Sequence, residues 1–146
     1  MPIRALTAAL ALAALTGAAA AREQVPAEER IHPYAAELLE ACDDPVVLDT
    51  IAKRFRQAEY GYWSSDLAIV GFANIRTTHF RDTGLDLIPR RHCRATVLLN
   101  NQRTSPVYYE LTQDAGMVGR GFGVRYCVMA YDRQWAFAPE CKMAKP

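Results

Sequence analysis

The sequence predicts an α+β fold in which an N-terminal helix packs on an antiparallel meander sheet of about four to five strands, stabilised by disulfides. Three observations support this prediction. A segment with helical periodicity precedes several segments with period-two alternation, short polar turns separate those segments, and the chain has four cysteines. Because the helix comes first and the strands follow it, one sheet wrapped around one helix is favoured over alternating βαβ units.

Residues 1–21 have the organisation of a secretory signal peptide. Arg4 supplies a positive start, an apolar run follows over residues 5–15, and Ala19 and Ala21 have the spacing that a signal peptidase accepts. We therefore expect an exported protein, periplasmic or secreted, whose mature chain begins at Arg22. The apolar run is too short and too rich in alanine for a stable transmembrane helix, so no membrane span is expected.

The mature chain is expected to have an arm and one domain. Residues 22–41 are polar and aperiodic and form the arm, with a candidate short helix over residues 34–41, whereas residues 42–146 form a single α+β domain. Asp44 is a favourable N-cap and Pro45 suits the first helical position. The helix that they begin is expected to run to about Ala58, with one apolar stripe made of Val47, Leu48, Ile51, Ala52 and Phe55.

The strands are expected after Gly61, where the composition becomes rich in β-branched and aromatic residues. The candidate strands are residues 67–80, 91–99, 107–112, 122–131 and 134–138. Short polar turns at Asn100-Asn101, at residues 114–116 and at Asp132-Arg133 favour hairpins between them.

The four cysteines, Cys42, Cys93, Cys127 and Cys141, allow three pairings. Spacing favours a local disulfide between Cys127 and Cys141, across the expected turn, which leaves Cys42 to pair with Cys93. An exported chain meets an oxidant, and the sequence lacks a C-x-x-C motif, so disulfides are favoured over zinc. No metal and no cofactor is expected.

The charge balance limits the partners. Without Arg4 the chain has 16 basic and 16 acidic residues, so nucleic acid is not an expected partner. The two halves differ, however: residues 22–66 contain five basic and ten acidic residues, and residues 67–146 contain eleven basic and six acidic residues. Either the halves neutralise each other, or the second half presents a basic binding face.

The candidate binding face begins on the strand over residues 91–99. Alternation places Cys93 inward, and Arg90, His92 and Arg94 form a cationic row on the opposite face, which could bind a carboxylate or a phosphate. The alternative is a solvated face that pairs with acidic residues of the first half. Aromatic and basic residues of the later strands complete the candidate face: Tyr108, Arg125 and Tyr131.

The second half of the chain contains two motifs that carry a resemblance to other proteins. They comprise Pro89-Arg90-Arg91-His92-Cys93, and Cys127-Val128 followed by Asp132-Arg133, Ala136, Ala138-Pro139 and Cys141. With these motifs, residues 42–146 resemble an uncharacterised family of small exported proteins of alphaproteobacteria. The resemblance implies a shared disulfide scaffold and no particular activity. His92 departs from the family pattern, which has Tyr at that position.

No catalytic motif stands out. His79 with Asp82, or Ser64 and Ser65, supply residue types that catalysis uses, but their spacing selects none of them. The leading hypothesis is a non-enzymatic binding or interaction module whose partner is an envelope protein or peptide. One alternative is a ligand carrier or an enzyme with a pocket between the helix and the sheet, and another is an inhibitor of an envelope hydrolase.

Overall fold

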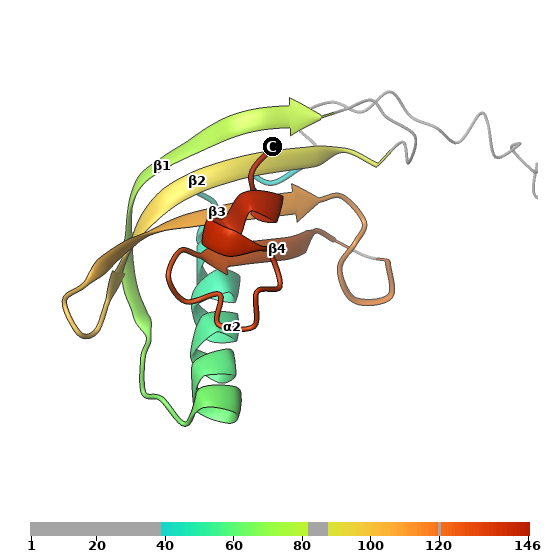
Figure 1. Ribbon diagram of the computed structural model, residues 1–146. Coiled ribbons are helices and arrows are strands. Elements are labelled where there is room, and N and C mark those ends of the chain that lie inside the picture. The colour runs from blue at the N-terminus through green and yellow to red at the C-terminus, as the bar shows by residue number, and fades with distance from the viewer. Residues whose placement is uncertain (1–38, 82–87, 120) are drawn as a thin grey trace, which may run out of the picture. The chain divides into compact units, whose positions relative to one another are not determined.

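The computed structural model describes residues 39–81, 88–119 and 121–146, all of which belong to one compact unit, Tyr34–Pro146. The elements are α2 (Pro45–Trp63), β1 (Ile69–Arg81), β2 (Arg90–Leu99), β3 (Thr104–Thr112), η4 (Met117–Gly119), β4 (Gly123–Val128) and η5 (Pro139–Ala144). The strands form one antiparallel sheet in the order β1-β2-β3-β4, and α2 packs on one face of it (Figure 1). The predicted α+β fold is confirmed.

The expected signal peptide and most of the expected arm, residues 1–38, lie outside the described residues. Of the candidate helix over residues 34–41, only residues 39–41 are described, and these are not helical.

Helix α2 begins as its sequence predicts. The Asp44 carboxylate accepts a hydrogen bond of 2.7 Å from the backbone N–H of Val46, which satisfies one of the free donors of the first turn. The helix continues beyond Ala58, its expected end, to Trp63, and Ser64 terminates it in the left-handed conformation. The extra turn forms because Glu59 continues the buried stripe at the i+4 position, with a partner from elsewhere in the chain.

The core fills the space between α2 and the sheet. Val47, Ile51 and Phe55 are 0 to 4% exposed and pack against the inward residues of the strands. On β2 and β3 these are Cys93, Ala95, Val97, Leu99, Val107, Tyr109 and Leu111. Because these side chains occupy the centre of the interface, the helix and the sheet leave no ligand pocket there in the described part of the chain, and the space between them is confined to a groove beside the edge strand β4.

Strand β1 is irregular. Its pairing with β2 shifts register three times, between Ile69 and Gly71, between Ala73 and Arg76, and between Thr77 and His79. Asn74 has φ of 54°, which is typical of a bulge position. Each shift changes which side chains point outward, so simple alternation does not describe this strand.

The C-terminal segment differs from the prediction. β4 ends at Val128 instead of Tyr131, because Ala130 has φ of 68° and the Tyr131 N–H donates to the Val128 carbonyl in a turn. The candidate strand over residues 134–138 is not a strand. Instead, both oxygens of the Asp132 carboxylate accept backbone N–H groups, from Ala136 and Phe137, and so hold this segment as a loop.

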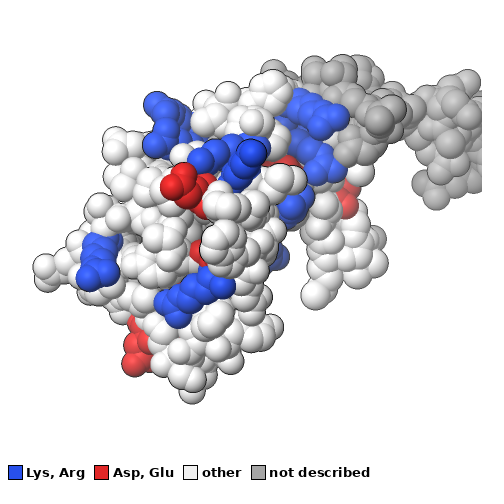
Figure 2. Space-filling model, viewed as in Figure 1, with Lys and Arg blue, Asp and Glu red and all other residues white. Residues whose placement is uncertain are grey.

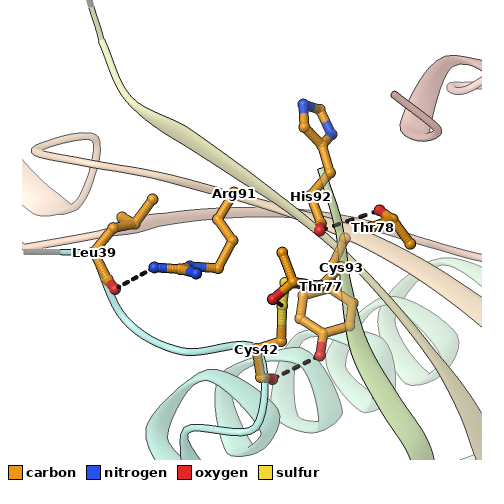
Figure 3. The surroundings of a disulfide bond; sticks show 8 residues. Leu39, Cys42, Thr77, Thr78, Arg91, His92 and Cys93 are labelled. Atoms are coloured by element: carbon orange, nitrogen blue, oxygen red, sulfur yellow. Dashed lines mark hydrogen bonds between the residues drawn. A yellow bond between two sulfur atoms is a disulfide. The ribbon is translucent and has the colours of Figure 1, made fainter. Parts of the chain in front are cut away.

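Disulfides join Cys42 to Cys93 and Cys127 to Cys141, which is the pairing that the spacing favours. Hydrogen bonds surround the first one: Tyr109 Oη donates to the Cys42 carbonyl at 2.6 Å, and Arg91 donates to the Leu39 carbonyl at 3.2 Å (Figure 3). The second disulfide lies in a separate small cluster with Tyr108 and Ala144, so it fastens η5 to the face of the sheet opposite α2. Two disulfides are compatible with an oxidising compartment.

Candidate functional site

The face of the sheet opposite α2, here called the outer face, carries most of the strands' charge. Register pairs place the arginine and histidine residues of β1 directly opposite those of β2: Arg76 opposite Arg94, His79 opposite His92, and Arg81 opposite Arg90. The four strands contain a single acidic residue, Glu110. Figure 2 shows that basic side chains cover far more of this face than acidic ones do. Arg76 and Arg94 oppose each other without an ion pair among the described residues. Like charges directly opposite each other destabilise a sheet, so this pair is not explained by folding alone.

Glu110 neutralises one end of the outer face. Its carboxylate accepts a hydrogen bond of 2.9 Å from Arg90 and one of 3.1 Å from Thr112 Oγ1. Arg125 is its register partner on β4. The only carboxylate of the strands therefore already binds Arg90 and Thr112. Its register partner on β2 is His92, whereas Arg94 pairs with Tyr108.

His92 occupies the middle of the outer face in a half-buried setting. Its ring lies 6.0 Å from that of His79, and its Nδ1 is 3.9 Å from Glu110 Oε2, which is too far for a hydrogen bond. Burial lowers the pKa of His92 below 6.5; Glu110 opposes this effect, while His79, Arg90 and Arg81 reinforce it. At neutral pH His92 is therefore uncharged, and the arginines provide the charge of the face.

Tyr108 is the centre of a second group of cations. Arg94 Cζ lies 5.5 Å from the centroid of its ring, and Lys145 Nζ lies 4.9 Å from the same centroid. Both cations therefore contact one aromatic ring, although they are far apart in the sequence. A similar contact places Arg125 over Phe137 at 5.5 Å.

The structure brings together five of the six residues of the candidate binding face. Arg90, His92, Arg94 and Arg125 lie on the outer face, and so does Tyr108, which is largely buried under its cations instead of exposed. The sixth assignment, Tyr131, was wrong. The turn after Val128 redirects the chain, and the Tyr131 ring packs edge-on against Phe55, with the core residues on the α2 side of the sheet.

Sequence reasoning missed four basic residues of the outer face: Arg76, His79, Arg81 and Lys145. The bulges of β1 conceal the first three, since alternation cannot be followed through a register shift. Lys145 lies on the face in the segment after η5, which the Cys127–Cys141 disulfide joins to β4. The excess of basic residues in the second half of the sequence was the one available signal.

The residues considered for catalysis do not form a catalytic arrangement. Ser64 caps α2, and Ser65 Oγ accepts the backbone N–H of Leu67. His79 faces His92, and Asp82 lies outside the described residues. Among the residues that the structure describes, no group of three His, Cys, Asp or Glu side chains could hold a metal ion.

Shallow grooves occur elsewhere on the surface. One of about 580 Å³ lies beside the C-terminal half of α2, between Lys53 and Asn100, and one of about 350 Å³ lies between α2 and the edge strand β4, bordered by Trp63 and Phe137. The first groove includes Ser65, Asp66 and Lys53, but the described hydrogen bond of Ser65 Oγ is with the Leu67 N–H and not with a base.

The fold and the outer face define a disulfide-stabilised helix-on-sheet domain with a cationic sheet surface. Comparisons with protein-family models, with curated proteins and with solved structures give no match. Within the residues that the structure describes, no helix has both the length and the apolar character needed to cross a bilayer.

Proposed function

We propose that this protein is an exported, non-enzymatic binding module, and that the outer face of its sheet is the surface that contacts a negatively charged envelope protein or peptide. One observation carries the proposal: two arginines without an ion pair among the described residues, Arg76 and Arg94, lie directly opposite each other on β1 and β2. This placement costs folding free energy, and a bound anion would offset that cost.

Two further features support a contact surface. The outer face is built on paired strands and not on loops, so its charges are held in a fixed array. Arg94 and Arg76 make no ion pair within the described residues, and their guanidinium groups remain available to a partner. Arginine is the residue best suited to such contacts, because its planar fork matches a carboxylate.

The test uses the full-length protein and immobilised poly-L-glutamate as an acidic polypeptide probe. The variant R76E/R94E reverses two charges of the outer face. The matched control, R56E/R103E, reverses two exposed charges of α2 and of the β2–β3 turn, and so changes the net charge equally.

We expect the face variant to bind about tenfold more weakly or worse, whereas the control keeps most of its affinity. Binding of the native protein should also weaken as salt is raised. Equal losses in the two variants would mean that net charge alone drives binding, and would overturn the assignment of the outer face.

A further inference from the structure

Two cations, Arg94 and Lys145, contact the Tyr108 ring, and a third, Arg76, lies directly opposite Arg94 on β1. Arg76, Arg94, Tyr108 and Cys127 form one register row across all four strands. Arg76 and Arg94 are directly opposite each other, so their Cα atoms are separated by about 4.5 to 5.5 Å. Arg94 also contacts the Tyr108 ring, and Lys145 contacts the same ring from the C-terminal segment.

None of these three cations has a carboxylate partner in the described part of the chain. Other arginines of the domain do: Arg90 pairs with Glu110, and Arg133 pairs with Glu59. The ion pairs found among the described residues leave out Arg76, Arg94 and Lys145 alike. The row around Tyr108 is therefore a local concentration of three positive charges next to a largely buried aromatic ring.

The disulfide Cys127–Cys141 places the third cation. Cys127 is the register neighbour of Tyr108, and Cys141 begins the turn of η5 that packs Ala144 into the same small cluster. Lys145 follows directly after this packed turn. The covalent bond therefore holds the ammonium group of Lys145 near Tyr108.

We propose that Arg76, Arg94 and Lys145 form a binding site for a phosphate monoester, assembled by the Cys127–Cys141 disulfide. This inference rests on the proposed function and names the ligand chemistry of one part of the outer face. A single carboxylate is satisfied by one forked arginine. A phosphate monoester carries a charge of about −1.5 to −2 and has three strong acceptor oxygens, so it suits three neighbouring cations. Its source is either a soluble phosphate or a lipid headgroup.

The first experiment titrates the full-length protein with inorganic phosphate at constant ionic strength and follows backbone and arginine side-chain signals by NMR. We expect saturable shifts around residues 76, 94, 108 and 145, and weaker binding of acetate. R94Q should weaken phosphate binding about tenfold, and K145Q should weaken it severalfold. R103Q, which removes an exposed charge away from the row, is the matched control and should change nothing. Acetate binding as tight as phosphate binding would overturn the inference.

The second experiment tests the role of the disulfide. C127S/C141S should bind phosphate as weakly as K145Q does, and adding K145Q to that variant should cause no further loss, because Lys145 is already displaced. If C127S/C141S does not fold, K145Q in the disulfide-bonded protein decides whether Lys145 belongs to the site. Additive losses would show that the disulfide does not position this residue.

The third experiment separates the two sources. Phosphatidylcholine vesicles with phosphatidic acid present a phosphate monoester, whereas vesicles with phosphatidylglycerol present a diester. Selective binding to phosphatidic acid, competed by inorganic phosphate, identifies a lipid headgroup; phosphate binding without vesicle binding identifies a soluble ligand. If the protein binds poly-L-glutamate through the outer face but does not bind phosphate, the inference fails and the proposed function stands. If it binds neither, both fail.

Discussion

Arg133 donates a hydrogen bond of 2.9 Å to the carboxylate of Glu59, whose side chain is only 3% exposed. The guanidinium also lies over the Trp63 ring at 5.1 Å. The loop after β4 thus closes over the last turns of α2 and neutralises the one acidic residue of the buried helix stripe. A buried carboxylate that loses its only charged partner destabilises the folded state strongly.

Arg133→Ala should therefore lower the free energy of unfolding by about 3 kcal/mol. Glu59→Gln, which retains the shape and removes the charge, should cost less, and the double variant should be more stable than Arg133→Ala alone. Urea unfolding at neutral pH measures all three. Additivity of the two single changes would show that the pair is not coupled.

Tyr109→Phe removes the hydroxyl that donates to the Cys42 carbonyl at 2.6 Å. The carbonyl then stays buried without this donor, so we expect a loss of about 1 to 2 kcal/mol of stability. Tyr62→Phe is the control, because Tyr62 is exposed. Equal stabilities of the Tyr109 variant and the native protein in urea would contradict the role given to this hydrogen bond.

The two disulfides should contribute unequally. Cys42–Cys93 closes a loop with a sequence separation of 51, and Cys127–Cys141 one of 14. By loop entropy, replacing the first pair with serine should cost about 4 kcal/mol and replacing the second about 3 kcal/mol. Thermal unfolding of the two double variants tests the order. Peptide mapping without reductant should recover both pairs, and a free thiol in the folded protein would contradict the pairing.

Mild acid should destabilise the protein through His92. Since its pKa is lowered in the folded state, the unfolded chain binds a proton more readily below pH 6.5. Its contribution is therefore fully present above pH 6.5 and is lost as the pH falls through the folded pKa. His92→Gln should make the free energy of unfolding depend less on pH in this range. His79→Gln should have a smaller effect, because it removes a lesser cause of the lowered pKa and leaves the burial of His92 in place. Identical profiles for native protein and His92→Gln would refute the effect.

High pH should destabilise the folded protein through Tyr126. Burial is the main cause that raises its pKa to about 12, so between pH 10 and 12 the unfolded chain loses this proton while the folded chain keeps it. Stability should decline across that interval. Burial also raises the pKa of Tyr109, so Tyr126→Phe should reduce the slope without abolishing it. A slope that Tyr126→Phe leaves unchanged would count against this explanation.

The sequence predicts those features of the fold that depend on residues close together in the chain, such as helix caps and strand alternation. The start of α2 follows from Asp44 and Pro45, and the outward row of Arg90, His92 and Arg94 follows from uninterrupted alternation along β2. The end of α2 is different, because Glu59 looks like a surface residue until Arg133 is known to reach it. A pairing over that distance has no signature in either segment.

The rest of the outer face depends on irregular backbone and on covalent closure. Register shifts decide the placement of Arg76 and His79, and a positive φ at Ala130 removes Tyr131 from the face. Such conformations at residues other than glycine are imposed by tertiary packing, so neither residue type nor periodicity indicates them. Lys145 likewise lies on the face next to a covalent bond, Cys127–Cys141, that joins its segment to β4.

The positions of the disulfides also determine how the domain would respond to tension. A force applied to the chain on either side of the domain passes from Cys42 directly to Cys93, and from Cys127 directly to Cys141. Helix α2 and strand β1 lie within the first covalent loop and bear no load. Only the section between Cys93 and Cys127 can extend, so the hydrogen bonds that join β3 to its two neighbours, together with those between β1 and the part of β2 after Cys93, set the mechanical strength of the protein.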